Sequence, residues 1–176
     1  MKQLGIKALN RFLKRELTVE VLEKYWDFQI FSEADLQSIV WKLLSEFITK
    51  ANSKPGEFLV LNKPYLRGLG IHPDIVVFRD RQPWVVIELK ERRVLEERSA
   101  RKELRRLLKT RVKLRAQKGY LLYVARYGDG RVLKGPKGKA ARFFCEIPII
   151  LEAVRPKESI RRWERVFRYW ARYDGE

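Results

Sequence analysis

Three residues in the middle of the chain, Asp74, Glu88 and Lys90, are of types that can hold a divalent cation and act on a phosphate ester. Carboxylate oxygens are the ligands that Mg²⁺ and Mn²⁺ prefer, and Mg²⁺ usually takes only one or two carboxylates together with water and phosphate. A lysine beside such a cation can position a water or stabilise charge on a phosphate. These are the parts that metal-assisted hydrolysis of a phosphodiester requires.

The segment between the two acids predicts a β-hairpin. Two apolar runs rich in β-branched and aromatic residues, 75–78 and 84–87, flank the mostly polar residues 79–83. This is the pattern of two strands joined by a five-residue loop. With that loop, Phe78 would pair with Trp84, and the two arms would run antiparallel back toward the acidic residues.

This register brings the three residues to one end of the hairpin. Counting back along both arms places Asp74 opposite Glu88, and the alternation of side chains puts Glu88 and Lys90 on one face of the strand. Like charges directly opposite each other are unfavourable. A divalent cation between the two carboxylates would offset their repulsion, so we expect a Mg²⁺ or Mn²⁺ site here.

Helices and strands on either side of the hairpin must hold it in place. Apolar residues at three- and four-residue steps predict helices at 4–30, 32–51 and 94–118, and a last helix from Ser159. Further strands are predicted at 58–61, 120–125 and 143–154. From residue 32 onward, the order helix, three strands, helix, strand indicates an α/β domain with a mixed sheet.

Single residues set the ends of some of these elements. Ser32 is a good N-cap, and Asp35 follows it in a near-capping-box position. Gly119 is expected to stop the helix at 94–118. Pro148 limits the strand at 143–154 to an edge or a bulge. The apolar face of the helix at 94–118 is predicted to consist of Ala100, Leu104, Leu107, Leu108 and Val112.

These residues resemble the PD-(D/E)XK nuclease superfamily. Pro73-Asp74 is similar to the PD of its motif, and Glu88-Leu89-Lys90 is similar to its (D/E)XK. The core of that family is a helix, three strands, a helix and a strand, so the resemblance covers about residues 32–127. It implies a restriction-endonuclease-like core, here with extra N- and C-terminal helices, and metal-dependent cleavage of nucleic acid.

The same resemblance implies a further acidic residue near the metal. Many members of the family place a glutamate on the first core helix. Glu33, in Glu33-Ala34-Asp35-Leu36, is similar to the E-x-x-L form of archaeal junction-resolving members, which implies that Glu33 completes the catalytic and metal-binding set. Glu46 on the same predicted helix is the alternative, and a carboxylate in the first turn of a helix also interacts favourably with the helix dipole.

Composition points to a polyanionic partner. The chain of 176 residues carries 39 Lys and Arg against 22 Asp and Glu, a formal charge of +17. Such an excess repels itself in the compact state unless a polyanion binds, and nucleic acid is the leading candidate. The single cysteine, Cys145, and the single histidine, His72, exclude a disulfide framework, a Cys-rich zinc site and a multi-histidine site.

Basic residues after the motif are candidates for contact with the phosphate backbone. Too few glutamates lie between residues 92 and 118 to neutralise them, although a solvated helix face would have the same composition. His72, just before the motif, is a candidate for contact with the substrate, or else an ordinary loop residue. The candidate nucleic-acid-binding residues are Arg92, Arg93, Arg101, Arg105, Lys109, Lys137 and Lys139.

The leading prediction is therefore a Mg²⁺-dependent deoxyribonuclease, an endonuclease acting on DNA. A non-catalytic nucleic-acid-binding module with the same fold is the alternative. We expect one domain over 1–176, with the core at 32–127, a helical extension at 1–30, and a strand and helix at 143–172. No apolar run approaches a membrane span and no signal peptide is apparent, so a cytoplasmic location is expected. The oligomeric state stays open, and a two-fold homodimer would suit symmetric cutting of two strands.

Overall fold

Four α-helices and one π-helical segment surround a five-stranded sheet in the described part of the chain. The computed structural model describes residues 4–27, 29–51, 56–66, 69–128, 133 and 142–151. The helices are α1 (Ile6–Arg11), η1 (Phe12–Glu16), α2 (Leu17–Trp26), α3 (Glu33–Ala51) and α4 (Glu97–Leu114). The strands are β1 (Phe58–Asn62), β2 (Ile75–Arg79), β3 (Gln82–Val94), β4 (Lys118–Tyr127) and β5 (Phe144–Ile150).

The sheet is mixed, as predicted. Its strands lie in the order β1-β2-β3-β4-β5. The pairs β1–β2 and β2–β3 are antiparallel, whereas the pairs β3–β4 and β4–β5 are parallel. α4 forms the crossover between the parallel strands β3 and β4. The predicted order of helix, three strands, helix and strand is the observed order of α3, β1, β2, β3, α4 and β4.

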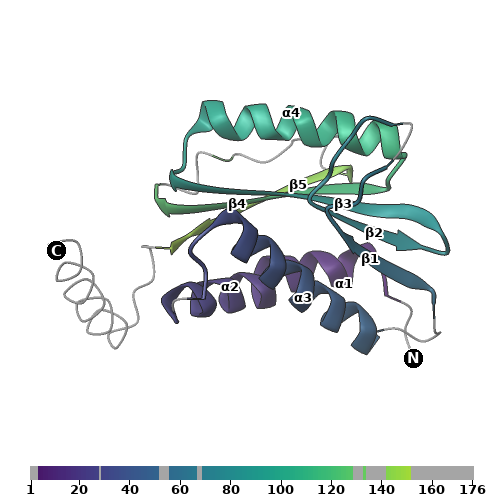
Figure 1. The fold of residues 1–176 in the computed structure, drawn as a ribbon, viewed down its shortest axis with the longest axis horizontal. Coiled ribbons are helices and arrows are strands. Elements are labelled where there is room, and N and C mark those ends of the chain that lie inside the picture. The colour runs from purple at the N-terminus through teal and green to yellow at the C-terminus, as the bar shows by residue number, and fades with distance from the viewer. Residues whose placement is uncertain are drawn as a thin grey trace, which may run out of the picture.

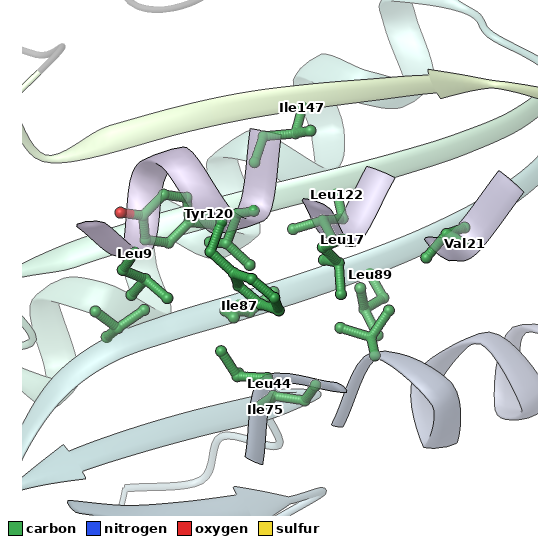
Figure 2. Close-up of a cluster of buried hydrophobic side chains, with 14 of the residues drawn as sticks. Leu9, Leu17, Val21, Leu44, Ile75, Ile87, Leu89, Tyr120, Leu122 and Ile147 are labelled. Atoms are coloured by element: carbon green, nitrogen blue, oxygen red, sulfur yellow. The ribbon is translucent and has the colours of Figure 1, made fainter. Parts of the chain in front are cut away.

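Helices cover both faces of the sheet. α4 lies on one face, and α1, η1, α2 and α3 lie on the other (Figure 1). On the second face Ile87 and Leu89 of β3 pack with Leu122 of β4 and with Leu17 and Leu44 of the helices (Figure 2). Because β3 and β4 are covered on both sides, residues 84–89 of β3 and 118–125 of β4 are buried, which explains why their apolar runs are nearly continuous.

The turn between β2 and β3 is shorter than predicted. Arg79 pairs with Gln82, so only Asp80 and Arg81 form the loop, where five residues were expected. Both loop residues have a left-handed backbone, with φ of 48° and 63°. This is the backbone of a tight hairpin turn whose twist matches the strands. The prediction of a longer loop was wrong because the usual sequence signal, an Asn-Gly or Asp-Gly pair, is absent.

A β-bulge restores the predicted register above this turn. Phe78 pairs with Pro83 and not with Trp84, whereas the next pair along the ladder is Val77 with Val85. Trp84 is therefore the extra residue of a bulge. From the pair Val77–Val85 onward, the residues of β2 and β3 pair as the five-residue loop would have paired them, although the loop itself was wrongly predicted.

α4 ends at Leu114 rather than at Lys118. Arg115, with φ of 54°, takes the left-handed conformation that ends the helix. Gly119 lies within β4, so its predicted role as a helix stop was wrong. A Cβ atom at Gly119 would lie 3.0 Å from Cδ1 of Leu107, which means that the glycine allows close packing of α4 on the sheet.

The buried face of α4 differs from the predicted one. Ala100 and Leu107 are buried as predicted, and Leu104 is partly buried. Leu108 and Val112, however, are 36% and 61% exposed. The buried stripe continues instead through Thr110 and Leu114. This stripe sets which basic residues of α4 lie beside the sheet and which point away from it.

β5 forms an edge of the sheet, in agreement with the prediction from Pro148. The helix predicted from Ser159 lies outside the described residues, and so do Lys137 and Lys139. None of the helices in the described ranges has the length and apolar character needed to cross a membrane.

Candidate active site

Asp74 and Glu88 lie side by side where the β2–β3 ladder ends. The last pair of the ladder is Ile75 with Ile87, so the next residue on each strand faces the other, as predicted. Oδ2 of Asp74 accepts a hydrogen bond of 2.8 Å from the backbone N–H of Leu89. This bond holds the Asp74 side chain against β3, beside Glu88.

The edge of β3 that β2 leaves open explains why acids gather here. β3 pairs with β4 as far as Val94, whereas its pairing with β2 stops at Ile87. The backbone N–H of Leu89 on this edge donates to Asp74, and that of Glu91 donates to Oε2 of Glu33 at 3.3 Å. The two carboxylates thus accept hydrogen bonds from backbone N–H groups that would otherwise pair with a neighbouring strand.

Glu33 reaches the site from the first turn of α3. The backbone N–H of Asp35 donates to Oγ of Ser32 at 3.2 Å, and Oγ of Ser32 donates to Oδ2 of Asp35 at 2.9 Å, so Ser32 caps the helix as predicted. Oε2 of Glu33 lies 2.9 Å from Nζ of Lys90. The side chain of Lys90 is only 13% exposed. Glu46, the alternative, is an exposed residue further along α3.

Glu88 is the most deeply buried acid of the site. Its side chain is 2% exposed, and its Oε1 is buried without a hydrogen-bond partner. Burial, and to a smaller extent repulsion by the neighbouring Asp74 carboxylate, raises the pKa of Glu88 to about 8, and the charge of Arg106 opposes this rise. A buried oxygen without a partner beside a second carboxylate is a position that a cation would satisfy.

Arg106 of α4 is a site residue that sequence reasoning did not single out. Its guanidinium lies 3.3 Å from Oε2 of Glu88 and also donates to the backbone oxygen of His72 at 3.2 Å. It forms a longer ion pair, of 3.8 Å, with Glu103. Arg106 precedes the buried Leu107, and this position next to the buried stripe could have indicated that Arg106 lies beside the sheet. That inference would have required the buried residues of α4 to be predicted correctly.

Gln37 is a second residue that the sequence did not indicate. It is buried, and its Nε2 donates to the backbone oxygen of Asp74 at 2.9 Å and to Oδ1 of Asn62 at 2.8 Å. The backbone N–H of Lys63 also donates to the oxygen of Asp74, at 2.8 Å. α3 and the end of β1 thus hold the backbone of Asp74 in place.

Tyr123 lies next to Lys90 in the parallel ladder between β3 and β4. The side chain of Tyr123 is fully buried and its hydroxyl has no hydrogen-bond partner. An unsatisfied buried hydroxyl costs about 1–3 kcal/mol. Tyr120, also fully buried, differs in that its hydroxyl donates to Oδ1 of Asn10 at 2.6 Å.

We therefore expect the two tyrosines to respond oppositely to removal of the hydroxyl. Tyr123→Phe should raise the free energy of unfolding by about 1 kcal/mol, whereas Tyr120→Phe should lower it by about 1 kcal/mol because Asn10 loses its donor. Urea unfolding followed by circular dichroism measures both values. A loss of stability in Tyr123→Phe equal to that in Tyr120→Phe would show that the Tyr123 hydroxyl has a partner.

A basic groove begins beside the carboxylates, between α4 and residues 70–72. Arg105 and Lys109, two of the predicted nucleic-acid-binding residues, line this groove. The ring of His72 stacks on that of Tyr65, with ring centroids 5.1 Å apart. The whole lining consists of Gly70, Ile71, His72, Lys102, Arg105, Arg106, Lys109, Thr110 and Lys113.

The other predicted basic contacts are more scattered. Arg101 forms an ion pair with Glu97 in a separate hollow at the start of α4. Arg92 and Arg93 are exposed near the end of β3. Arg92 donates to the backbone oxygen of Glu91, and Arg93 lines a pocket on another side of the molecule.

The donor set fits a cation with few protein ligands. Across the described residues, no cluster of three or more Asp, Glu, His or Cys side chains could hold a metal ion. Glu33 lies against Lys90, whereas Asp74 and Glu88 lie next to each other, so these two carboxylates form the candidate cation site. Two carboxylates, with water and phosphate oxygens completing the shell, are a usual arrangement for Mg²⁺.

Taken together, the structure brings two carboxylates, a lysine and a basic groove to one end of the hairpin, and two carboxylates are a donor set of the kind that Mg²⁺ takes. Glu88 supplies a buried oxygen without a partner, Glu33 orients Lys90, and the basic groove adjoins Arg106. Comparison of the chain with protein-family models, with curated proteins and with solved structures finds no match.

Proposed function

We propose that this protein is a metal-dependent nuclease that hydrolyses phosphodiester bonds in DNA as an endonuclease. The observation that carries the proposal is the Asp74–Glu88 pair at the end of the hairpin, in which Oε1 of Glu88 is buried without a partner while Lys90 follows on the same strand. The resemblance of these residues to the PD-(D/E)XK motif supports the same function, as does the order of α3, β1, β2, β3, α4 and β4, which is the order that this resemblance implies.

In this proposal each residue of the site has a separate task. Asp74 and Glu88 would hold Mg²⁺ or Mn²⁺, and such a cation would supply a Lewis acid at the phosphate. Lys90 stabilises the negative charge that develops on the phosphate oxygens. Glu33 keeps the ammonium group of Lys90 in position through the 2.9 Å ion pair. Gln37 acts indirectly, by fixing the backbone of Asp74.

The basic groove along α4 supplies the affinity for DNA. Its lysines and arginines would contact phosphates, which gives strong binding and little reading of the base sequence. Binding through phosphates releases counterions, so affinity should fall steeply as the salt concentration rises. This is also the role we propose for the net charge of +17.

Incubation of the protein with supercoiled plasmid tests this function. A closed circle has no ends, so nicking identifies an endonuclease. We expect relaxed and linear products with Mg²⁺ or Mn²⁺ and none with chelator, because the cation supplies the Lewis acid. If DNA is bound but no product forms with either cation, the protein is a non-catalytic binding module. A panel of duplex, branched and single-stranded substrates then identifies the preferred DNA.

A further inference from the structure

Arg106 connects the carboxylate pair with the basic groove. One terminal nitrogen of its guanidinium lies 3.3 Å from Oε2 of Glu88 and 3.2 Å from the backbone oxygen of His72. The same side chain lines the groove between α4 and residues 70–72. Within the described ranges, Arg106 is the basic residue that shares an ion pair with Glu88.

The two ends of this ion pair lie in different surroundings. The side chain of Glu88 is 2% exposed, whereas that of Arg106 is 51% exposed. Charge-assisted hydrogen bonds between a guanidinium and a carboxylate usually measure about 2.7–2.9 Å, so the pair is a loose one. Arg106 can therefore leave Glu88 and remain solvated in the groove, while Glu88 cannot follow it.

A cation bound by Asp74 and Glu88 would change the electrostatic forces on the guanidinium of Arg106. It would offset the negative charge of the Asp74–Glu88 pair, which attracts the guanidinium in the metal-free protein, and would add a positive charge a few ångströms away. Arg106 would then be repelled by the metal site and attracted by a phosphate in the groove. Its second partner, the carbonyl oxygen of His72, lies on the wall of the same groove and keeps the side chain near it.

We propose that Arg106 couples the two ligands of the site: it holds Glu88 when no cation is bound and contacts a backbone phosphate of DNA once the cation is in place. The inference rests on the proposed function and adds to it that the bound cation regulates the binding of DNA. Arg106 is a positioning residue for the substrate, and cation binding should tighten DNA binding through it.

Lys109 provides a matched control. It lines the same groove and carries the same charge, but it has no ion-pair partner in the part of the chain that the structure describes. It should contact phosphates whether or not a cation is bound. Lys109→Gln should therefore weaken DNA binding equally in both conditions, whereas Arg106→Gln should weaken it mainly when a cation is present.

Fluorescence anisotropy with a labelled duplex tests this coupling. The affinity is measured in chelator and in Ca²⁺, with a gel to confirm that the DNA stays intact. In the wild type we expect Ca²⁺ to tighten binding about tenfold, and in Arg106→Gln about twofold. Lys109→Gln should keep the tenfold ratio. Equal ratios in Arg106→Gln and the wild type would overturn the inference.

A second variant tests the coupling without relying on Arg106→Gln being folded. Glu88→Ala removes the partner that holds Arg106, so it should tighten DNA binding in chelator and abolish the response to Ca²⁺. Glu46→Ala removes the same side chain from an exposed position on α3 and should leave both affinities unchanged. If Glu88→Ala binds DNA in chelator no better than Glu46→Ala does, the inference is wrong.

The two proposals fail in different ways. Cation-dependent nicking by the wild type together with an undiminished Ca²⁺ response in Arg106→Gln would overturn the role of Arg106 and leave the nuclease intact. The absence of both nicking and a Ca²⁺ response in the wild type would overturn the nuclease and, with it, the inference that rests on it.

Discussion

Replacing Asp74 by Asn is expected to lower the rate of plasmid nicking by about 10³-fold, because the cation loses one of its two carboxylate ligands. The amide keeps the size of the side chain, and its oxygen can still accept the hydrogen bond from the backbone N–H of Leu89. The fold should therefore survive. The rate is measured as the initial loss of supercoiled plasmid in Mg²⁺.

The control for this experiment removes a carboxylate that does not belong to the site. Glu46→Gln changes the charge of α3 by the same amount at an exposed position, and it should nick plasmid at the rate of the wild type. DNA binding by Asp74→Asn in chelator should also match the wild type, because the basic groove is intact. A nicking rate in Asp74→Asn within about twofold of the wild type would refute Asp74 as a metal ligand.

Glu88 should make the metal-free protein less stable as the pH rises. Its pKa is raised from an ordinary value of 4.5 to about 8, chiefly by burial. As the pH rises, Glu88 loses its proton near pH 4.5 in the unfolded chain but keeps it up to about pH 8 in the folded protein. Between about pH 4.5 and pH 8 the free energy of unfolding should fall, by up to about 5 kcal/mol, and the loss should be complete above pH 8.

Glu88→Gln isolates this effect, because the amide is neutral at every pH. In chelator, the variant and the wild type should be of similar stability near pH 4.5, and the variant should be the more stable by a few kcal/mol above pH 8. Added Mg²⁺ should stabilise the wild type at high pH and leave the variant unchanged. Denaturant unfolding at a series of pH values gives both curves. A constant difference between the two proteins across this range would mean that Glu88 does not titrate with a raised pKa.

The order of the core elements could be predicted because it depends on local patterns. Continuous apolar runs of β-branched residues mark the buried strands, and apolar residues at helical spacing mark α3. The position of Asp74 opposite Glu88 was also predicted, but for an incomplete reason. The loop is three residues shorter than expected, and the bulge at Trp84 compensates for the difference in register.

The rest of the site depends on contacts between distant parts of the chain. Arg106 reaches Glu88 because the buried stripe of α4 runs through Leu107 and Thr110. The predicted stripe included Leu108 and Val112, which are exposed, and therefore gave no reason to choose Arg106 over its basic neighbours. The partner of a charged residue that borders the buried face of a helix can be predicted only when the orientation of the helix about its own axis is known.

The open edge of β3 has a consequence for solubility. Unpaired strand edges are places where two protein chains can add to each other's sheets and aggregate. Here Asp74 and Glu33 occupy the edge amides of Leu89 and Glu91, so an incoming strand would have to displace two carboxylates to pair there. The acids that we assign to catalysis would thus also protect the protein from self-association through this edge.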